Sequence, residues 1–328
     1  MALAVTLAVP ALALAGCSSD SSTDAAPSAS ASSDGPWTYT DDLGVTVKLD
    51  HTPTRVAGLN DAIVPLMDYG LQPVASFGYS SLADDARFAD LDTTGVTEVG
   101  TEYGEINLED LATAQPDVII TLAYPTDSKG TIDKTQPLWG FKDLEQQKQI
   151  EKIAPVITVV MGGNGSDVID TFAKLSESLG ANPTTIADAK SGFDSAAADL
   201  GKATADNPLK VTAMYADADG INVAHAQDDP ALRMYSEMGV TFTEPDNDDY
   251  YWSTTSWENA TKIGGDVLLQ QQAAYSVDEL KKQKTFADNP ALVAGQVYPW
   301  VDAGMDYVGQ AAYIEQLTGW LSAAKPVA

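Results

Sequence analysis

The stretch NLEDL at residues 107–111, followed by PDVII at 116–120, has a counterpart in SWENA at 256–260, followed by GDVLL at 265–269. In both copies a glutamate, Glu109 or Glu258, precedes an aspartate by eight residues, and the aspartate opens an apolar run. A polar residue two positions before each glutamate is typical of a helix N-cap, which places both glutamates in a first helical turn. The repeat therefore predicts one helix–strand unit in each half of the chain.

Short apolar runs alternate with helical patterns in both halves. Strands are expected at 55–59, 73–77, 117–122 and 155–160, and again at 211–215, 221–224, 240–242, 266–269 and 296–298. Helices are expected at 62–69, 108–114, 231–238 and 307–321, and a hairpin is expected at 37–49 around the turn DDLG. This alternation indicates an α/β fold built on largely parallel sheets.

A long helical region separates the two halves. Apolar residues recur at helical spacing from Val168 to Leu179, Gly180 interrupts the pattern, and the same period resumes until Gly201. We therefore expect two Rossmann-like α/β lobes joined by a long rigid helix. The predicted boundaries are an N-terminal lobe at 37–165, a helical spine at 166–202 and a C-terminal lobe at 203–328.

The first residues have the features of a lipoprotein signal. Residues 1–15 are almost wholly apolar and lead into LAGC at 14–17, the form of a bacterial lipobox. Cys17, the single cysteine, is then the lipidated residue; residues 1–17 are signal peptide and lipobox, and the polar residues 18–36 are a flexible tether. No Lys or Arg precedes the apolar run, so we expect the true start upstream. An ordinary signal peptide with an incidental cysteine is the alternative.

The composition argues against several functions. The formal net charge is −29, from 18 basic and 47 acidic side chains, and a field of that sign repels nucleic acid. Two histidines and one cysteine are too few for a zinc or manganese site. The sequence also lacks a G-x-S-x-G elbow, a Walker loop and an H-E-x-x-H motif. We expect a binding protein, not an enzyme, with no directly bound metal and no cofactor.

These pieces, in this order, resemble the substrate-binding lipoproteins of iron–siderophore and cobalamin importers. The resemblance covers about Val45 to Leu321 and rests on EINLE at 105–109 before PDVII, IAPV at 153–156, YWST at 251–254 before SWE, and VYPW at 297–300. It implies the metal-chelate class of periplasmic binding protein, with ligand in a cleft between the lobes. It also implies that Glu109 and Glu258 dock onto arginines of a dimeric ABC permease. The simpler alternative is that both glutamates only complement helix dipoles.

The resemblance also implies ligand residues, because ferric-hydroxamate receptors of this family line the cleft with aromatic side chains. Tyr124 matches a cleft tyrosine, and Trp252 and Trp300 match cleft tryptophans. The weaker candidates are Tyr79, Tyr215, Tyr250, Tyr251 and Tyr307. Burial in the core is the alternative for each of these residues.

One departure from the family pattern concerns charge. The receptors in question carry an arginine six residues before the first glutamate, where this chain has Tyr103, itself a further candidate ligand residue. Arg87 or Arg233 would replace that arginine if the ligand requires a positive charge. Because the chain has three arginines and a large acidic excess, a neutral or cationic hydroxamate chelate is favoured over a strongly anionic catecholate.

We therefore expect a monomeric extracytoplasmic receptor that captures a ferric siderophore and delivers it to the permease. The lipid on Cys17 would hold the protein at the outer face of the cell membrane, as on a Gram-positive surface. Haem or a cobalamin in the same fold is a second hypothesis. A surface hydrolase or an adhesion lipoprotein is a third.

Overall fold

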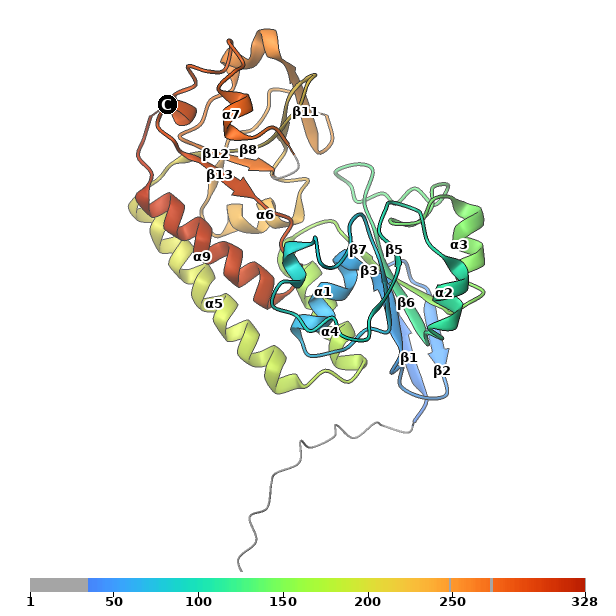
Figure 1. Cartoon of the computed structure of the whole chain (residues 1–328). Coiled ribbons are helices and arrows are strands. Elements are labelled where there is room, and N and C mark those ends of the chain that lie inside the picture. Colours follow the sequence, from blue (N-terminus) through green and yellow to red (C-terminus); the bar gives the residue numbers. More distant parts are fainter. Residues whose placement is uncertain (1–34, 248, 272–273, 328) are drawn as a thin grey trace, which may run out of the picture. The chain divides into compact units, whose positions relative to one another are not determined.

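Two sheets carry the fold (Figure 1). The computed structural model describes residues 35–247, 249–271 and 274–327, so Cys17, the predicted signal and most of the predicted tether lie outside the described residues. The first sheet has the strand order β5-β4-β3-β6-β7, and every neighbouring pair is parallel. The second has the order β11-β9-β8-β12-β13, with β10 also beside β8. The expected α/β class is confirmed.

The first sheet is built from residues 56–160. Its strands are β3 (Val56–Leu59), β4 (Ala75–Phe77), β5 (Thr97–Gly100), β6 (Val118–Ala123) and β7 (Val156–Val160). The helices between them are α1 (Asn60–Asp68), the 3-10 helix η1 (Ala86–Phe88), α2 (Leu108–Thr113) and α3 (Leu144–Ile150). β3 and β6 are buried along their whole length, as expected for central strands covered on both faces. The predicted hairpin is present as β1 (Trp37–Thr40) paired with β2 (Thr46–Leu49).

The second sheet differs by an antiparallel edge. Its strands are β8 (Lys210–Ala216), β9 (Gly220–Ala224), β10 (Thr241–Phe242), β11 (Trp252–Ser256), β12 (Val267–Gln271) and β13 (Val297–Trp300). The associated helices are α6 (Pro230–Glu237), the 3-10 helix η2 (Trp257–Lys262), α7 (Val277–Leu280) and α8 (Pro290–Val293). β10, β12 and β13 run parallel to their neighbours, whereas β9 pairs antiparallel with both β8 and β11.

The aspartates of the sequence repeat perform the same structural task in both sheets. Asp117 opens β6 and accepts hydrogen bonds from the backbone N–H groups of Thr54 and Arg55, just before β3, both at 2.9 Å. Asp266 opens β12 and accepts from the N–H of Lys210, at the start of β8, also at 2.9 Å. Each carboxylate thus fixes the register of one central strand against its neighbour.

The strand orders extend this correspondence. β6 lies between β3 and β7, as β12 lies between β8 and β13. The helices of the repeat differ in one respect. The side chain of Asn107 caps α2 by accepting from the N–H groups of Glu109 and Asp110, whereas Ser256 makes no side-chain cap and is followed by the 3-10 helix η2. Glu258 is therefore in a first turn, as predicted, but not in an α-helix.

The helical region between the sheets forms two helices, α4 (Gly165–Ser178) and α5 (Pro183–Asp206). Gly180 has φ +97° and separates them, and Asn182 starts α5 by accepting from the N–H of Thr184. The expectation that Gly201 ends the helix was wrong, because α5 continues for another turn. Packing of Phe193, Ala196 and Leu200 outweighs the cost of a helical glycine, which is about 1 kcal/mol.

The last helix, α9 (Tyr307–Ala323), packs along α5 (Figure 1). It also contacts α1. The backbone N–H of Tyr307 donates to the hydroxyl of Tyr69, the residue that follows α1, at 3.0 Å. The helical connection therefore consists of segments far apart in the sequence. Among the described residues, no helix is long and apolar enough to cross a membrane.

Two carboxyl groups meet where α1 ends and α9 begins. Asp306 is fully buried and caps α9, since one of its oxygens accepts from the N–H groups of Val308 and Gly309 at 2.8 Å. Its other oxygen, Oδ2, has no donor from an N–H or hydroxyl of the described residues and faces the carboxyl of Asp68. Burial, reinforced by the charge of Asp306, raises the pKa of Asp68 to about 8. A shared proton between the two groups satisfies both.

Because of the Asp68–Asp306 pair, we expect the free energy of unfolding to fall as pH rises. Asp68 binds its proton with a pKa of about 8 in the folded chain, against 3.8 as the ordinary value, so the folded state holds more protons between those values. In Asp68→Asn the amide donates to Asp306 at every pH. We expect the wild-type protein to lose up to about 1.4 kcal/mol of unfolding free energy per pH unit relative to this variant. Urea unfolding between roughly pH 5 and pH 8 measures the difference. The control is Asp199→Asn at an exposed position, which should show the same dependence of unfolding free energy on pH as the wild-type protein. Parallel curves for wild type and Asp68→Asn would contradict the shared proton.

Candidate functional site

The carboxyl ends of the parallel strands in the first sheet lead into polar and aromatic side chains. Asp61 lies two residues after β3, Tyr79 two residues after β4, and Tyr124 immediately after β6. Carboxyl ends of parallel strands meet at one edge of a sheet, which is where open α/β sheets bind their ligands. The fold therefore brings these separate segments to a single location.

Four aromatic rings gather there and are called the first aromatic cluster: Tyr79, Tyr103, Tyr124 and Trp139. The centroids of Tyr79 and Tyr103 are 5.6 Å apart in a stacked arrangement, and Trp139 contacts Tyr103 at 5.4 Å and Tyr124 at 5.0 Å. Although they touch one another, the four side chains remain 38–46% exposed. Large aromatic residues clustered on an open surface are typical of a binding site.

Trp139 was not among the predicted site residues. It lies in the segment between β6 and α3, and its backbone N–H donates to the carbonyl of Leu122 at 2.9 Å. The hydroxyl of Thr121 donates to the carbonyl of Trp139 at the same place. This added bridge to β6 brings the indole beside Tyr124. No repeat or spacing in the sequence marks such a contact.

A second aromatic cluster comes from the second sheet and contains Tyr215, Tyr250, Tyr251, Trp252 and Trp300. The ring of Trp252 lies 5.1 Å from Tyr251, 5.8 Å from Trp300 and 6.4 Å from Tyr215. Tyr250 joins through Tyr251 at 6.2 Å. The structure thus brings together Trp252 and Trp300 with three of the weaker candidates, although Trp300 itself is only 4% exposed.

Tyr251 is held in an unusual backbone conformation. Its φ is +65°, a left-handed value that non-glycine residues seldom adopt. Its N–H donates to Asp228 at 3.1 Å, its carbonyl accepts from His225 at 2.8 Å, and its hydroxyl donates to Asp229 at 2.7 Å. Backbone strain of this kind persists only where surrounding bonds enforce it, which is common at ligand sites.

Charged groups from both halves of the chain act on the tyrosines of the two clusters. Burial raises the pKa of Tyr124, and the charges of Asp61, Asp302 and Asp229 raise it further. Asp61 belongs to the first sheet's side of the site, whereas Asp229 and Asp302 follow strands of the second. Burial and Asp229 likewise raise the pKa of Tyr251, and Tyr124 adds to the effect. Carboxylates from both halves of the chain therefore affect the hydroxyl of Tyr124.

Arg87 is close to this site, but its guanidinium is already occupied. Nε and Nη2 donate to the two oxygens of Asp85 at 2.9 and 2.7 Å, and Nη1 donates to Asp61. Burial lowers the pKa of Arg87, but the two carboxylates outweigh it and the net shift is upward. Arg87 organises Asp61 and Asp85 and is matched by two negative charges.

Two further predicted residues are placed elsewhere. Tyr307 lies in the helical connection, where its hydroxyl donates to Asp170 and its ring packs against Phe193 at 5.5 Å. Arg233 is half-buried on α6. Within the described part of the chain it forms no ion pair. The structure does not join Tyr307 or Arg233 to either aromatic cluster.

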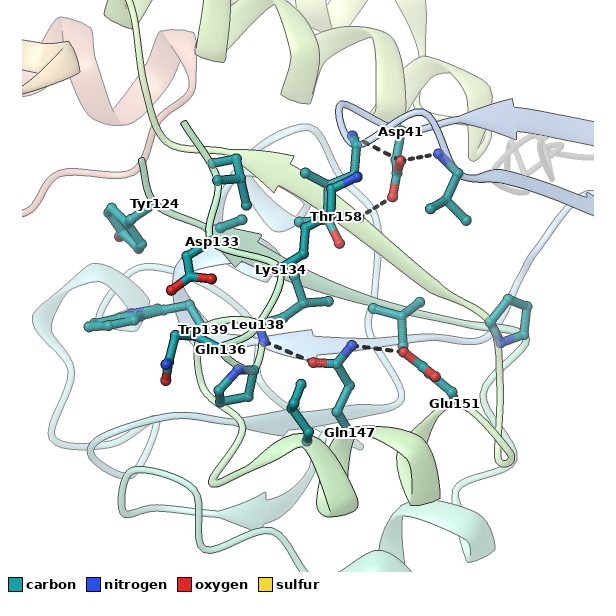
Figure 2. A pocket seen from close by; sticks show the side chains of 18 of the residues that line it. Asp41, Tyr124, Asp133, Lys134, Gln136, Leu138, Trp139, Gln147, Glu151 and Thr158 are labelled. Carbon is teal, nitrogen blue, oxygen red and sulfur yellow. Dashed lines mark hydrogen bonds between the residues drawn. The ribbon is translucent and has the colours of Figure 1, made fainter. Parts of the chain in front are cut away.

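A pocket of about 750 Å³ lies beside the first aromatic cluster, with Tyr124 and Trp139 in its wall (Figure 2). The hairpin, the segment 125–138, α3 and β7 form the remaining walls. Asp41 attaches the hairpin to β7, since its carboxylate accepts from the N–H groups of Leu43, Val45 and Thr158. The segment carrying Trp139 is held from the other side, where Gln147 accepts from the N–H of Leu138 at 2.9 Å (Figure 2).

Glu109 and Glu258 occupy corresponding positions on the two halves of the fold. Both are exposed, Glu109 at the start of α2 and Glu258 at the start of η2. In the part of the chain that the structure covers, neither carboxylate has an ion pair or side-chain hydrogen bond. Both are therefore free to meet a partner.

Direct metal coordination finds no support in the geometry. Nowhere among the described residues do three His, Cys, Asp or Glu side chains come together in a way that could hold a metal ion. His51 pairs with Asp50 and Asp117 at the surface, and His225 contacts Asn247.

Comparison with known proteins agrees with this architecture. DesE, a ferric-siderophore receptor protein from Streptomyces coelicolor, has 29% identity and a TM-score of 0.79, covering 89% of this chain and 100% of its own. SirA from Staphylococcus aureus, complexed with staphyloferrin B, has 18% identity and a TM-score of 0.62, with coverages of 87% and 98%. FhuD from Vibrio cholerae, bound to Fe3+–Desferal, has 18% identity and a TM-score of 0.59, with coverages of 83% and 99%.

At their identity, SirA and FhuD support the fold alone. A search of curated proteins gave no match. Residues 79–303, most of the chain, match a family described as periplasmic binding protein, whose members bind ligands and are not enzymes. That span includes both aromatic clusters and both glutamates of the repeat. The chain therefore belongs to the periplasmic binding protein family.

Proposed function

We propose that this protein is an extracytoplasmic receptor that binds a ferric siderophore of the hydroxamate type between its two aromatic clusters. The observation that carries the proposal is the exposure of Tyr79, Tyr103, Tyr124 and Trp139 at the carboxyl ends of the first sheet. The outside of a ferric chelate is largely apolar linker around a metal–oxygen core, and aromatic faces suit such a surface. The likeness to DesE, a ferric-siderophore receptor, supports this ligand class.

The charges around the site support a hydroxamate over a catecholate. A ferric tris-catecholate carries a large negative charge and needs several free basic groups. Arg87 is the guanidinium near the site, and it is bound to Asp61 and Asp85. Asp229 and Asp302 add further negative charge. Hydroxamate chelates are neutral or cationic, so this surface does not repel them.

We further propose that the receptor delivers its ligand to an ABC permease and acts as a monomer. Glu109 and Glu258 are exposed, unpaired among the described residues, and related by the repeat. Two such carboxylates suit a dimeric partner that presents an arginine from each half. The lipid anchor at Cys17, on a Gram-positive surface, belongs to the same proposal and rests on the lipobox sequence.

The ligand class is tested by titrating the protein with ferrioxamine, a ferric catecholate, haem and cobalamin. Trp139 and Trp252 lie in the two clusters, so binding should quench tryptophan fluorescence. We expect saturable quenching by ferrioxamine and at least about tenfold weaker binding of the other three, a difference of about 1.4 kcal/mol. Tightest binding of haem or cobalamin would replace the siderophore with the second hypothesis. Turnover of a chromogenic ester would instead favour a surface hydrolase.

The contribution of the first aromatic cluster is tested with Trp139→Ala. The indole contacts both Tyr103 and Tyr124. Its loss therefore removes one aromatic surface of the site and the packing that holds the two tyrosine rings in place. We expect about tenfold weaker ferrioxamine binding, since an aromatic contact contributes on the order of 1 kcal/mol beyond the area it buries. The control is Trp320→Ala on α9, which removes an indole stacked on Tyr298 away from both clusters. Equal losses in both variants would show that Trp139 is not a ligand residue.

Permease docking is tested by the double charge reversal Glu109→Arg with Glu258→Arg. Both side chains are exposed and make no side-chain contacts among the described residues, so folding and ligand affinity should survive. Ferric-siderophore uptake by cells should be abolished. The reversal of exposed Glu145 and Glu237 supplies the control with the same change in net charge. Normal uptake by the Glu109 and Glu258 variant would rule out this docking mode.

A further inference from the structure

The pocket beside the first aromatic cluster, with a volume of about 750 Å³, has a mainly apolar wall drawn from four elements. Val45 and Val47 come from the hairpin, Ala123 from the end of β6, Leu144 from α3 and Val156 from β7. Val45 and Leu144 nevertheless remain 51% and 38% exposed. A concave surface of this volume with exposed apolar side chains is typical of a site for a small apolar group.

Polar side chains of this wall are bonded within the protein. The carboxylate of Asp41 accepts from three backbone N–H groups. The amide of Gln147 accepts from a backbone N–H and donates to Glu151, both at 2.9 Å (Figure 2). Among the described residues, the buried side-chain N and O atoms that lack a hydrogen bond all lie outside this pocket. A ligand group here therefore gains by burying apolar surface and has no orphaned hydrogen bond to complete.

Two aromatic rings join the pocket to the first aromatic cluster. Tyr124 and Trp139 line the pocket and also belong to that cluster, with their centroids 5.0 Å apart. Figure 2 shows both of them at the side of the pocket away from Asp41 and Glu151. Trp139 also contacts Tyr103, at 5.4 Å, so its indole borders both the cluster and the pocket. A ligand that lies on the cluster is therefore next to the apolar wall.

We propose that this pocket binds a hydrocarbon chain carried by the siderophore, so that the receptor prefers acylated, amphiphilic ferric chelates. The inference rests on the proposed function and narrows the ligand class within it. The iron-binding groups would lie on the aromatic cluster and the chain in the pocket. Each methylene group that is removed from water tightens binding about fourfold. A chain thus adds affinity that does not depend on the charge of the chelate.

The test compares two ferric chelates that differ only in chain length. N-acetyl and N-decanoyl ferrioxamine B are both neutral and share one hydroxamate core. Because Trp139 lines the pocket, tryptophan fluorescence reports the titration of either chelate. Burial of about three methylene groups is enough for a preference of about fiftyfold, so the wild-type protein should bind the decanoyl chelate at least that much more tightly.

Substitutions in the wall assign this preference to the pocket. Val45→Glu and Leu144→Glu each place a carboxylate in a separate part of the wall, at positions exposed enough to accept it. A chain cannot be buried against a carboxylate without desolvating it, so each variant should reduce the preference to about fivefold or less. The matched control is Val293→Glu on α8, a 70% exposed position outside the pocket, which should keep the wild-type preference.

Equal wild-type affinity for the two chelates would overturn this inference and leave the proposed function standing. A full preference in both Val45→Glu and Leu144→Glu would overturn it as well, because the chain would then bind elsewhere. Free decanoate should bind far more weakly than the decanoyl chelate, and equally tight binding would separate the pocket from the siderophore. A failure of both chelates to bind would instead overturn the proposed function.

Discussion

The packing of α9 along α5 is the contact on which the arrangement of the site depends. α5 leads from the first sheet into the second, and α9 is the last helix of the chain. The N-terminal end of α9 is attached to α1 by the hydrogen bond from Tyr307 to Tyr69 and by the carboxyl pair Asp68–Asp306. Helix packing and buried polar contacts therefore join the two halves of the fold.

Within each half, the position of the functional groups follows from the parallel sheet. Central strands that are covered on both faces must be apolar. Polar side chains and exposed aromatic side chains are therefore found where these strands end. This is why Asp61, Tyr79 and Tyr124 come together although they are far apart in sequence. Asp117 and Asp266 maintain the register from the opposite end of the strands by holding the neighbouring strand through its N–H groups. The repeat thus contributes to stability at the edge opposite the one from which Asp61, Tyr79 and Tyr124 project.

The site combines a large aromatic surface with negative charge. Arg87 does not reverse that sign, because Asp61 and Asp85 together outweigh it. Charged groups and aromatic rings therefore occur together at the carboxyl ends of the strands. Tyr251, held at positive φ by three hydrogen bonds of its backbone and hydroxyl, adds a rigid element to that surface.

Much of this architecture was predictable from the sequence, because strand and helix patterns depend on local apolar spacing. The α/β class, most strands, the hairpin and the glutamate–aspartate repeat were visible in that way. β5, β11 and α3 were not predicted, since β5 and β11 are exposed edge strands with little apolar content and α3 is a short polar helix. Gly201 was misjudged because packing of α5 outweighs a local preference.

The sequence by itself determined which residue types were available: many tyrosines and tryptophans, few arginines and a large acidic excess. Only the tertiary structure decided which of them meet. It placed Trp139 beside Tyr124, placed Tyr307 in the helical connection and bound Arg87 to two carboxylates. The contacts behind these outcomes include pairs 18, 26 and 137 residues apart, and no periodicity along the chain records such contacts.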